Sequence, residues 1–375
     1  MLAAERQEKI LAVVRANGTV RLADLATRLG VTPVTVRRDV TALADKGLLE
    51  RVHGGVTQPR RGVRAANAEL APARSAFGVM AAQTLIGIVT PSVSYYWPQV
   101  IQGAQAATVG AAGRLALRGS SYDPAEDRRQ VTRLLERGVR ALLVAPTMEG
   151  KAGLDLLRWL GSLTIPVVLM ERVPPPELPA LELDAVVTAH SLGAGLAVRH
   201  LVSLGHRRVG LVTTRHSPTS RALRSGWAQA CASLELEPAP DEFVPGYGSP
   251  GWAQAYDALV WSCLDAGVRA LVVHADREAI GIVERARDLG LSVPGDLAVV
   301  AYDDEVAAAA DPPLTAVRTP RHRLGAVAVE LALSMVADEP GRPVHRVELW
   351  PTLMVRESCG ASPVLGSYRI VHDRL

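Results

Sequence analysis

The sequence has few cysteines and no long apolar run, and each shortage excludes a class of protein. Its 375 residues include three cysteines, Cys231, Cys263 and Cys359, which are far apart and lack metal-ligand spacing. This excludes a disulfide framework and indicates buried structural thiols. No apolar stretch reaches the length of a membrane span, and residues 1–15 lack the apolar core and cleavage site of a signal peptide. We therefore expect a cytoplasmic protein with no membrane partner.

Catalytic motifs are also missing. The sequence contains no Gly-rich phosphate loop of the P-loop kind, no GxSxG and no HExxH. His190, His200 and His206 lie near one another, but their spacings of ten and six do not make a helical metal motif. We expect no enzyme activity, no cofactor and no metal, and we keep an enzyme acting on a sugar or sugar phosphate as a remote alternative.

Positive charge is concentrated at the start of the chain. Residues 1–64 hold twelve Lys and Arg against six Asp and Glu, a balance of +6, whereas the remainder carries −3. A basic head on a mildly acidic body is the asymmetry expected when one domain alone meets phosphate. Nucleic acid is therefore the first partner to consider.

Residues 31–55 (VTPVTVRRDVTALADKGLLERVHGG) have the pattern of a DNA-reading helix followed by a basic wing. Thr32 and Pro33 supply an N-cap and a proline at the first helical position, so we predict that a helix begins there. Apolar residues at three- and four-residue spacings predict two shorter amphipathic helices upstream: Ile10, Leu11, Val14, Leu22, Leu25 and Leu29. The segment LLERVHGG predicts a strand and a glycine turn.

Polar side chains of the third helix and of the wing are suited to contact DNA. Arginine forks pair with guanine edges or phosphates, and threonine bonds a phosphate or a base edge. The predicted DNA contacts are Thr32, Thr35, Arg37, Arg38, Thr41, Arg51 and His53. The alternative is that the paired arginines lie on the solvated face of an ordinary three-helix bundle.

This first part of the chain resembles the winged helix-turn-helix of the DeoR family of bacterial regulators. The resemblance is carried by RQEKIL, LADLATRLGVTPVTVRRDV and GLLERVHGGV. It implies a DNA-binding domain over residues 1–58. Residues 59–83, rich in Ala, Arg, Pro and Gly without a firm period, are predicted to form a linker.

From Leu85 onward, short apolar runs alternate with helical stretches. The runs LIGIVT, RALLVAP, IPVVLM, RRVGLVT, RALVVHA and DLAVVAY are each short enough for a buried parallel strand. This rhythm predicts an α/β fold with parallel sheets.

The order and the amino-acid sequences of these segments resemble those of the sensor domain of the LacI/GalR repressors, which share the periplasmic sugar-binding protein fold. Segments such as IGIVTPSVSYYWPQVIQGAQ, HLVSLGHRRVGLVT, REAIGIVERARDLGLSVPGDLAVVAYDD and PPLTAVRTPRHRLGAVAVELAL carry the match. It implies two lobes with a ligand between them, near the C-terminal ends of the strands. The implied boundaries are 84–358 for the domain, 85–188 and 320–344 for the first lobe, 189–319 and 345–358 for the second lobe, and 359–375 for a tail.

The resemblance implies ligand contacts at strand ends and in the loops after them. Asp303 matches the cleft aspartate of the family, and a helix N-cap is its alternative role. Glu171 stands where the family often has aspartate. Arg221 and Arg224 flank the position of the family's cleft arginine, with Arg221 placed first, and both alternatively lie on a solvated helix face.

Aromatic side chains add to the predicted site. Tyr96 and Trp97 follow the first strand, and Tyr247 lies in the matching loop of the second lobe. These aromatic side chains either stack on a ligand ring or pack within the protein.

One position departs from the family pattern. Asp276 keeps the family's aspartate, whereas Ala275 replaces the asparagine before it, so a common ligand amide is missing. His274 is either a substitute for that amide or a structural histidine.

Together these features predict a homodimeric, DNA-binding transcriptional regulator that is controlled by a small carbohydrate in the cleft. The resemblance implies a repressor, because repression is usual in that family. The carboxylate, arginine and aromatic set favours a free sugar, and a purine co-repressor is the alternative. No tyrosine-proline hinge motif lies between Gly55 and Leu85. We therefore expect the wing and linker, rather than a hinge helix in the minor groove, to transmit the signal.

Overall fold

The computed structural model divides the chain into an N-terminal unit, residues 1–79, and a C-terminal unit, residues 80–375. It describes the C-terminal unit almost completely and the N-terminal unit in pieces. The described residues are 6, 9–11, 13–14, 20–32, 35–36, 38–40, 43, 49–52, 55–57, 84–215, 217–337 and 342–361.

The N-terminal unit contains helices and a small antiparallel sheet around one apolar core. The sheet has the order β1-β3-β2 and is built from β1 (Val20–Arg21), β2 (Glu50–Val52) and β3 (Gly55–Thr57). Helix α2 spans Leu22–Leu29, and the described residues among 35–43 are helical. The predicted helices and wing are therefore present, and their apolar faces meet in the core: Ile10, Val14, Leu25, Val36, Val40, Leu43 and Val56 are buried.

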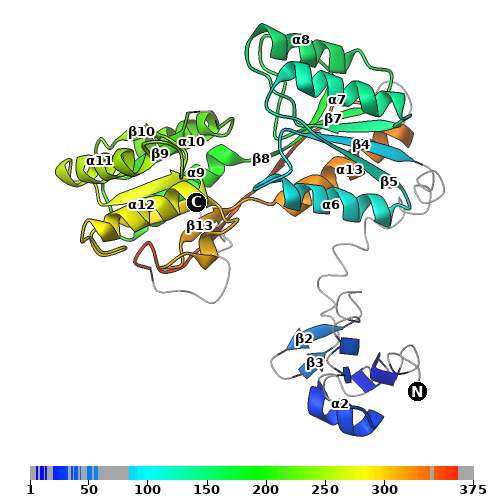
Figure 1. The fold of residues 1–375 in the computed structure, drawn as a ribbon, viewed down its shortest axis with the longest axis horizontal. Helices are drawn as coiled ribbons and strands as arrows, with labels where there is room; N and C mark the ends of the chain where they lie inside the picture. Colours follow the sequence, from blue (N-terminus) through cyan, green and yellow to red (C-terminus); the bar gives the residue numbers. More distant parts are fainter. Residues whose placement is uncertain are drawn as a thin grey trace. The chain divides into compact units, whose positions relative to one another are not determined.

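The C-terminal unit is built around two six-stranded sheets, each forming the centre of one lobe (Figure 1). Helices cover both faces of each sheet, as in an α/β fold. This two-lobed, parallel-sheet architecture confirms the predicted fold class.

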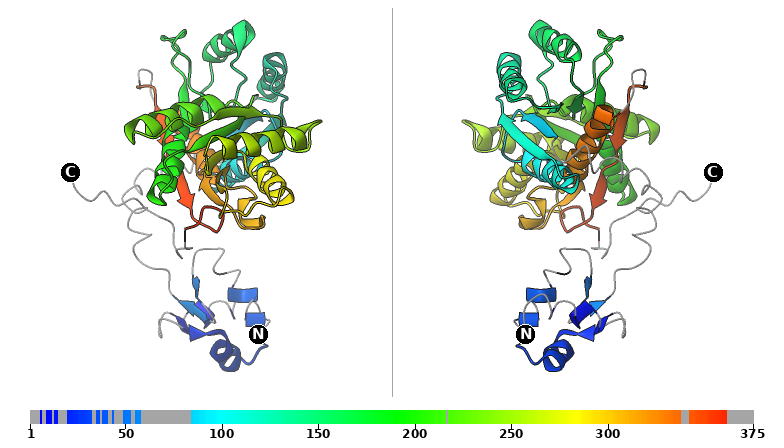
Figure 2. Two further views of the ribbon diagram at one scale, coloured as in Figure 1. Left: turned by 90° about the vertical axis from the view of Figure 1, so that its left-hand side faces the viewer. Right: turned by 90° about the vertical axis from the view of Figure 1, so that its right-hand side faces the viewer.

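The first sheet has the order β14-β8-β7-β6-β4-β5 and is parallel throughout. Its strands are β4 (Leu85–Thr90), β5 (Arg114–Gly119), β6 (Ala141–Val144), β7 (Val167–Met170), β8 (Asp184–Thr188) and β14 (Arg346–Leu349). Helices α6 (Trp97–Gly110) and α13 (Arg321–Ala337) pack together on one face, and α7 (Pro124–Glu136) and α8 (Gly150–Gly161) contribute to the core on the other (Figure 2). Strands β6 and β7 are buried at every residue, which explains why their sequences are continuously apolar.

The second sheet has the order β10-β9-β11-β12-β13-β15, with β15 alone antiparallel to its neighbour. Its strands are β9 (Gly210–Thr214), β10 (Asp241–Val244), β11 (Ala270–His274), β12 (Ala298–Asp303), β13 (Thr315–Arg318) and β15 (Thr352–Met354). Helices α9 (His190–Ser203) and α10 (Ser220–Ser233) pack on one face, and α11 (Trp252–Asp265) and α12 (Asp276–Asp288) on the other. A short 3-10 helix, η2 (Ala307–Ala309), follows β12.

Three segments connect the lobes. They lie between β8 and α9, between β13 and α13, and between β14 and β15. One predicted boundary is wrong: β14 pairs with β8, so residues 346–349 belong to the first lobe and not to the second. The apolar alternation of this short edge strand was too brief to show its partner, and only the pairing register reveals it.

Candidate functional site

A cleft of about 110 Å³ lies between the lobes, at the carboxyl ends of the parallel strands. Its lining residues all come from strand ends or from the segments that follow them. They are Tyr95, Tyr96, Trp97, Tyr122, Glu171, Arg172, His190, Ser217, Pro218, Thr219, His274 and Asp303. Four of the eight residues predicted to contact a ligand are among them: Tyr96, Trp97, Glu171 and Asp303.

Glu171 follows β7 and is held by four hydrogen bonds from the protein. Its Oε1 accepts the hydroxyls of Tyr96 and Thr188, the latter at 2.6 Å. Its Oε2 accepts the Thr188 backbone N–H at 3.0 Å and contacts His190 Nε2 at 3.1 Å. Burial opposes the charged carboxylate, but His190 and these hydrogen bonds outweigh burial and lower the pKa of Glu171 to about 2. The carboxylate therefore fixes Tyr96 and His190 in the cleft wall.

His190 continues this network into the second lobe. It is the first residue of α9, directly after the β8 crossing segment. Its Nδ1 lies 3.2 Å from the hydroxyl of Tyr302, and that hydroxyl also lies 3.3 Å from the His190 carbonyl oxygen. Buried polar contacts thus run from Tyr96 through Glu171 and His190 to Tyr302, which precedes Asp303.

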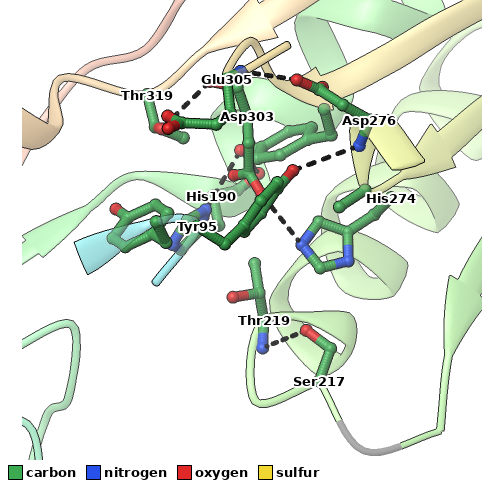
Figure 3. A network of polar contacts seen from close by, with 12 residues as sticks. Tyr95, His190, Ser217, Thr219, His274, Asp276, Asp303, Glu305 and Thr319 are labelled. Carbon is green, nitrogen blue, oxygen red and sulfur yellow. Dashed lines mark hydrogen bonds and ion pairs between the residues drawn. The ribbon is translucent and has the colours of Figure 1, made fainter. Parts of the chain in front are cut away.

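Asp303 and His274 face each other at the ends of neighbouring strands β12 and β11 (Figure 3). His274 Nε2 lies 3.5 Å from Asp303 Oδ2, and the two residues are 7% and 3% exposed. Asp303 has a φ of +102°, a conformation that costs energy for any residue except glycine. Burial lowers the pKa of His274, but Asp303 and the nearby carboxylates outweigh burial and raise that pKa overall. Asp303 thus ends a strand and lines the cleft.

Asp276, which the sequence also predicts to contact a ligand, is fully buried. It does not line the cleft, and its carboxylate accepts the backbone N–H groups of residues 304–307 at 2.5 to 3.1 Å. Burial raises the pKa of this carboxylate to about 6, against the effect of the hydrogen bonds. Asp276 thus fixes the loop that follows Asp303, and its backbone N–H donates to Tyr95 Oη at 3.3 Å (Figure 3).

The same loop is tied to the first lobe by Glu305. Its Oε2 lies 2.9 Å from Arg321 Nη1 and accepts a hydrogen bond from Gln99 Nε2 at 3.2 Å. Arg321 also donates to the Asp304 carbonyl at 3.1 Å, is 2% exposed, and lies 5.7 Å from the centre of the Tyr96 ring. We call these contacts of Gln99, Glu305 and Arg321 the interlobe clasp.

Three further predicted ligand residues lie outside the cleft lining. Arg221 is exposed on α10, and Arg224 on the same helix pairs with Asp241 and covers the Phe243 ring at 4.2 Å. Tyr247 packs on Trp252 and donates to Glu284 Oε2 at 3.0 Å. Local spacing placed these residues near the family's arginine and loop positions, but it could not show which way their side chains point.

Sequence reasoning missed several lining residues, and one general signal would have found most of them. Tyr122 follows β5, Arg172 follows β7, and residues 217–219 follow β9. Residues just beyond the carboxyl end of a parallel strand are the expected site in α/β folds. Tyr95, with a φ of +57°, precedes the predicted pair Tyr96 and Trp97 in the same loop.

The N-terminal unit shows part of the predicted DNA-binding surface. Thr32 and Arg38 are exposed, and Thr35 is half-buried. The Thr35 backbone N–H lies 3.4 Å from Thr32 Oγ1, as the predicted N-cap requires. Asp39, beside Arg38, is buried and pairs with Arg6, so it supports the helix from within. Arg37, Thr41, His53 and the side chain of Arg51 lie outside the described residues.

The structure offers neither a metal centre nor a membrane span within the residues it describes. No cluster of three or more His, Cys, Asp or Glu side chains is arranged to hold a metal ion in that part of the chain. None of its helices there combines the length and the apolarity needed to cross a membrane.

Two family models match parts of the chain. Residues 6–61 match the DeoR-like helix-turn-helix domain, and residues 198–359 match the periplasmic binding protein-like domain. The HTH-type transcriptional regulator MalR of Streptomyces coelicolor is 30% identical over 361 residues, which cover 92% of this chain and 98% of that protein. An uncharacterized HTH-type transcriptional regulator from the aml 5′ region of Streptomyces limosus is 33% identical over 286 residues, 73% of this chain and 78% of that protein.

Solved structures show the same fold. A LacI family transcriptional regulator from Enterococcus faecium with bound ribose has a TM-score of 0.59 at 21% identity, covering 73% of this chain and 98% of its own. A complex of the transcriptional regulator CelR with cellobiose has a TM-score of 0.60 at 21% identity, covering 88% and 91%. At these identities the likeness establishes the fold of the chain.

Proposed function

Because the chain belongs to the HTH-type transcriptional regulators that carry a periplasmic binding protein-like domain, we propose that it binds operator DNA under the control of an uncharged carbohydrate in the cleft. The regulator acts as a homodimer and, by our proposal, as a repressor.

The observation that carries the carbohydrate proposal is the buried carboxylate of Asp303 among aromatic side chains. Asp303 is 3% exposed, and Tyr95, Tyr96 and Tyr122 line the same cleft. A fixed carboxylate accepts hydrogen bonds from ring hydroxyls, and aromatic faces cover the apolar faces of a sugar ring. The sugars bound by two solved regulators of this fold, ribose and cellobiose, have this chemistry.

The proposed mechanism is a shift between two arrangements of the lobes. A ligand that contacts both walls of the cleft favours one lobe angle, and it shifts the equilibrium only by its differential affinity for the two arrangements. In a dimer the lobe angle sets the spacing of the two DNA-binding units. Paired helix-turn-helix units read two half-sites at a fixed separation, so a change of spacing changes operator affinity.

A thermal-shift screen of the full chain tests the effector class. The panel holds ribose, arabinose, cellobiose, maltose, glucose 6-phosphate and hypoxanthine. Ligand at about a hundred times its dissociation constant adds roughly 2.7 kcal/mol to the free energy of unfolding. We expect stabilisation by a neutral sugar, abolished in Asp303→Ala and kept in Asp155→Ala, a control on the exposed pair with Arg158. Stabilisation by hypoxanthine alone would favour a purine co-repressor instead.

A further inference from the structure

His274 lines the cleft, whereas its neighbour Ala275 offers no polar side chain. We propose that His274 and Asp303 together form a subsite for one hydroxyl group of the effector. The imidazole donates a hydrogen bond to the hydroxyl oxygen, and the carboxylate accepts a hydrogen bond from the hydroxyl. This inference rests on the proposed carbohydrate effector and names the residue that selects it.

The geometry of the pair leaves both partners able to bind a third group. Nε2 of His274 and Oδ2 of Asp303 are 3.5 Å apart, beyond the usual length of a direct hydrogen bond. Both side chains line the cleft and are almost fully buried. The contact joins the ends of adjacent strands, because His274 pairs in register with Tyr302, the residue before Asp303. The register of β11 and β12 therefore brings the two side chains together at the edge of the cleft.

The left-handed backbone of Asp303 is a second observation that points to binding. A φ of +102° is energetically costly for aspartate, and residues strained in this way cluster at functional sites. Figure 3 shows its carboxylate directed toward the imidazole, with Tyr95 beside the pair. A glycine at this position would remove the strain, but it would also remove the carboxylate.

A neutral hydroxyl matches this pair better than a charged group does. A hydroxyl both accepts from an imidazole N–H and donates to a carboxylate. An ammonium group has no lone pair for the N–H and is repelled by an imidazolium. A phosphate or carboxylate group is repelled by Asp303. On these grounds the pair favours, at this position in the cleft, the hydroxyl of an uncharged sugar over a phosphate or an amine.

The groups around His274 favour its charged form. Asp303 lies on β12, and Asp276 and Glu278 lie on α12, and all three raise the pKa of His274 against the effect of burial. The ring of Tyr302 packs 5.9 Å away, and Tyr95 lies across the cleft near Asp276 and Asp303. As the pH rises through the pKa of His274, the imidazole loses its charge, and its hydrogen bond to a hydroxyl weakens.

A ligand-free measurement tests the pairing of the two residues. Histidine resonances of the full chain are followed by NMR against pH, with His274→Gln to assign the His274 signal. We expect a pKa above the usual 6.5 that falls by about one unit or more in Asp303→Asn. A pKa below 6.5, or one that Asp303→Asn leaves unchanged, would show that the pair does not exist in solution.

A binding measurement then tests recognition. The affinity of the full chain for cellobiose, maltose, ribose and arabinose is measured by calorimetry from pH 6 to 9. In the wild type, affinity for the sugar that binds falls with rising pH, and His274→Leu weakens it roughly tenfold to a hundredfold. His274→Gln keeps an N–H donor, so it retains more affinity than His274→Leu but loses the pH dependence. If the pH dependence came from Asp276 instead, it would persist in His274→Gln.

The binding results distinguish failure of the hydroxyl subsite from failure of the proposed carbohydrate effector. Asp155→Ala, in the exposed pair with Arg158, is the control and leaves affinity unchanged. If a sugar binds and its affinity and pH profile are the same in His274→Gln and His274→Leu as in the wild type, the subsite is wrong and the proposed function stands. If none of the four sugars binds, the proposed effector fails and the hydroxyl subsite fails with it, even where the NMR result shows the pair.

Discussion

At the scale of single residues, Glu171 is the centre of a hydrogen-bond network in the cleft wall. Its side chain is 5% exposed and its two oxygens accept hydrogen bonds from Tyr96, Thr188 and His190. Little capacity is left for a ligand, so we expect Glu171 to act mainly by holding Tyr96 and His190 in place. Its Oε atoms are the link between a cleft aromatic of the first lobe and the first residue of α9.

The stability contributed by Glu171 has a defined pH dependence. Its folded-state pKa of about 2 lies below the ordinary value of 4.5, so the contribution is present above about pH 5 and is lost as the pH falls toward 2. The shift corresponds to roughly 3 kcal/mol. We expect Glu171→Gln to lower the free energy of unfolding by an amount that shrinks with decreasing pH, measured by urea unfolding from pH 7 to 3.

A control separates this effect from general acid destabilisation. Glu330 forms an exposed pair with Arg323, and Glu330→Gln should change the unfolding free energy by less than about 1 kcal/mol at every pH. A difference between Glu171→Gln and wild type that stays constant from pH 7 to 3 would show that the carboxylate is not the charged centre of this network.

The sequence predicted individual site residues only in part. Asp303 and Tyr96, predicted from the resemblance to the LacI/GalR sensor domain and from their positions after strands, both line the cleft. The position of Asp276, with its carboxylate under the loop of residues 304–307, depends on how two neighbouring segments meet. His274 was left between a ligand and a structural role, because sequence spacing does not give the distance to Asp303.

At the scale of helices, close packing of α6 against α13 depends on glycine. A Cβ atom built on Gly103 would lie 1.8 Å from the carbonyl oxygen of His322, and one on Gly325 would lie 1.9 Å from that of Val100. These contacts involve backbone atoms, which cannot move aside without separating the helices. The two helices cover one face of the first sheet, and Trp97, the first residue of α6, lies in the core on that face.

Two alanine substitutions within one helix test this requirement. We expect Gly103→Ala to lower the free energy of unfolding by about 3 kcal/mol or more through overpacking. Gly110→Ala, at the end of the same helix and with no atom within 4 Å of the new Cβ, should be neutral or stabilising by up to about 1 kcal/mol. Thermal unfolding of both variants measures the difference, and equal stabilities would contradict the packing argument.

Elements were easier to predict than their partners. The apolar runs predicted the buried strands β6, β7, β11 and β12, because strands covered on both faces need continuous apolar sequence. Strand β14 was assigned to the wrong lobe, since its exposed and half-buried residues carry no such signal. Nor could the sequence show which glycines lie at helix contacts, because that depends on the packing of residues more than two hundred positions apart.

For the whole C-terminal unit, the interlobe clasp holds the two lobes in the arrangement seen here. Arg321 is 2% exposed, and Glu305 supplies the negative charge beside it. Glu305→Ala leaves a buried arginine without that charge, and we expect it to lower the free energy of unfolding by about 3 kcal/mol. Glu330→Ala, at an exposed pair, should cost less than about 1 kcal/mol.

Tryptophan fluorescence during urea unfolding is the measurement for these two variants. All six tryptophans lie between residues 97 and 350, so the signal reports on the C-terminal unit. A Glu305→Ala protein as stable as Glu330→Ala would mean that the clasp does not hold the lobes together in solution.

The central claim, control of operator binding by a sugar in the cleft, is tested most directly by fluorescence anisotropy with the full chain. The DNA is a sequence selected by the protein from a random pool, and affinity is measured with and without the sugars of the panel. The account predicts a selected site with two half-sites, an affinity that one neutral sugar changes at least about tenfold, and loss of that response in Asp303→Ala with DNA affinity intact. An enriched site whose affinity no sugar changes, or a pool from which no sequence is enriched, would contradict it.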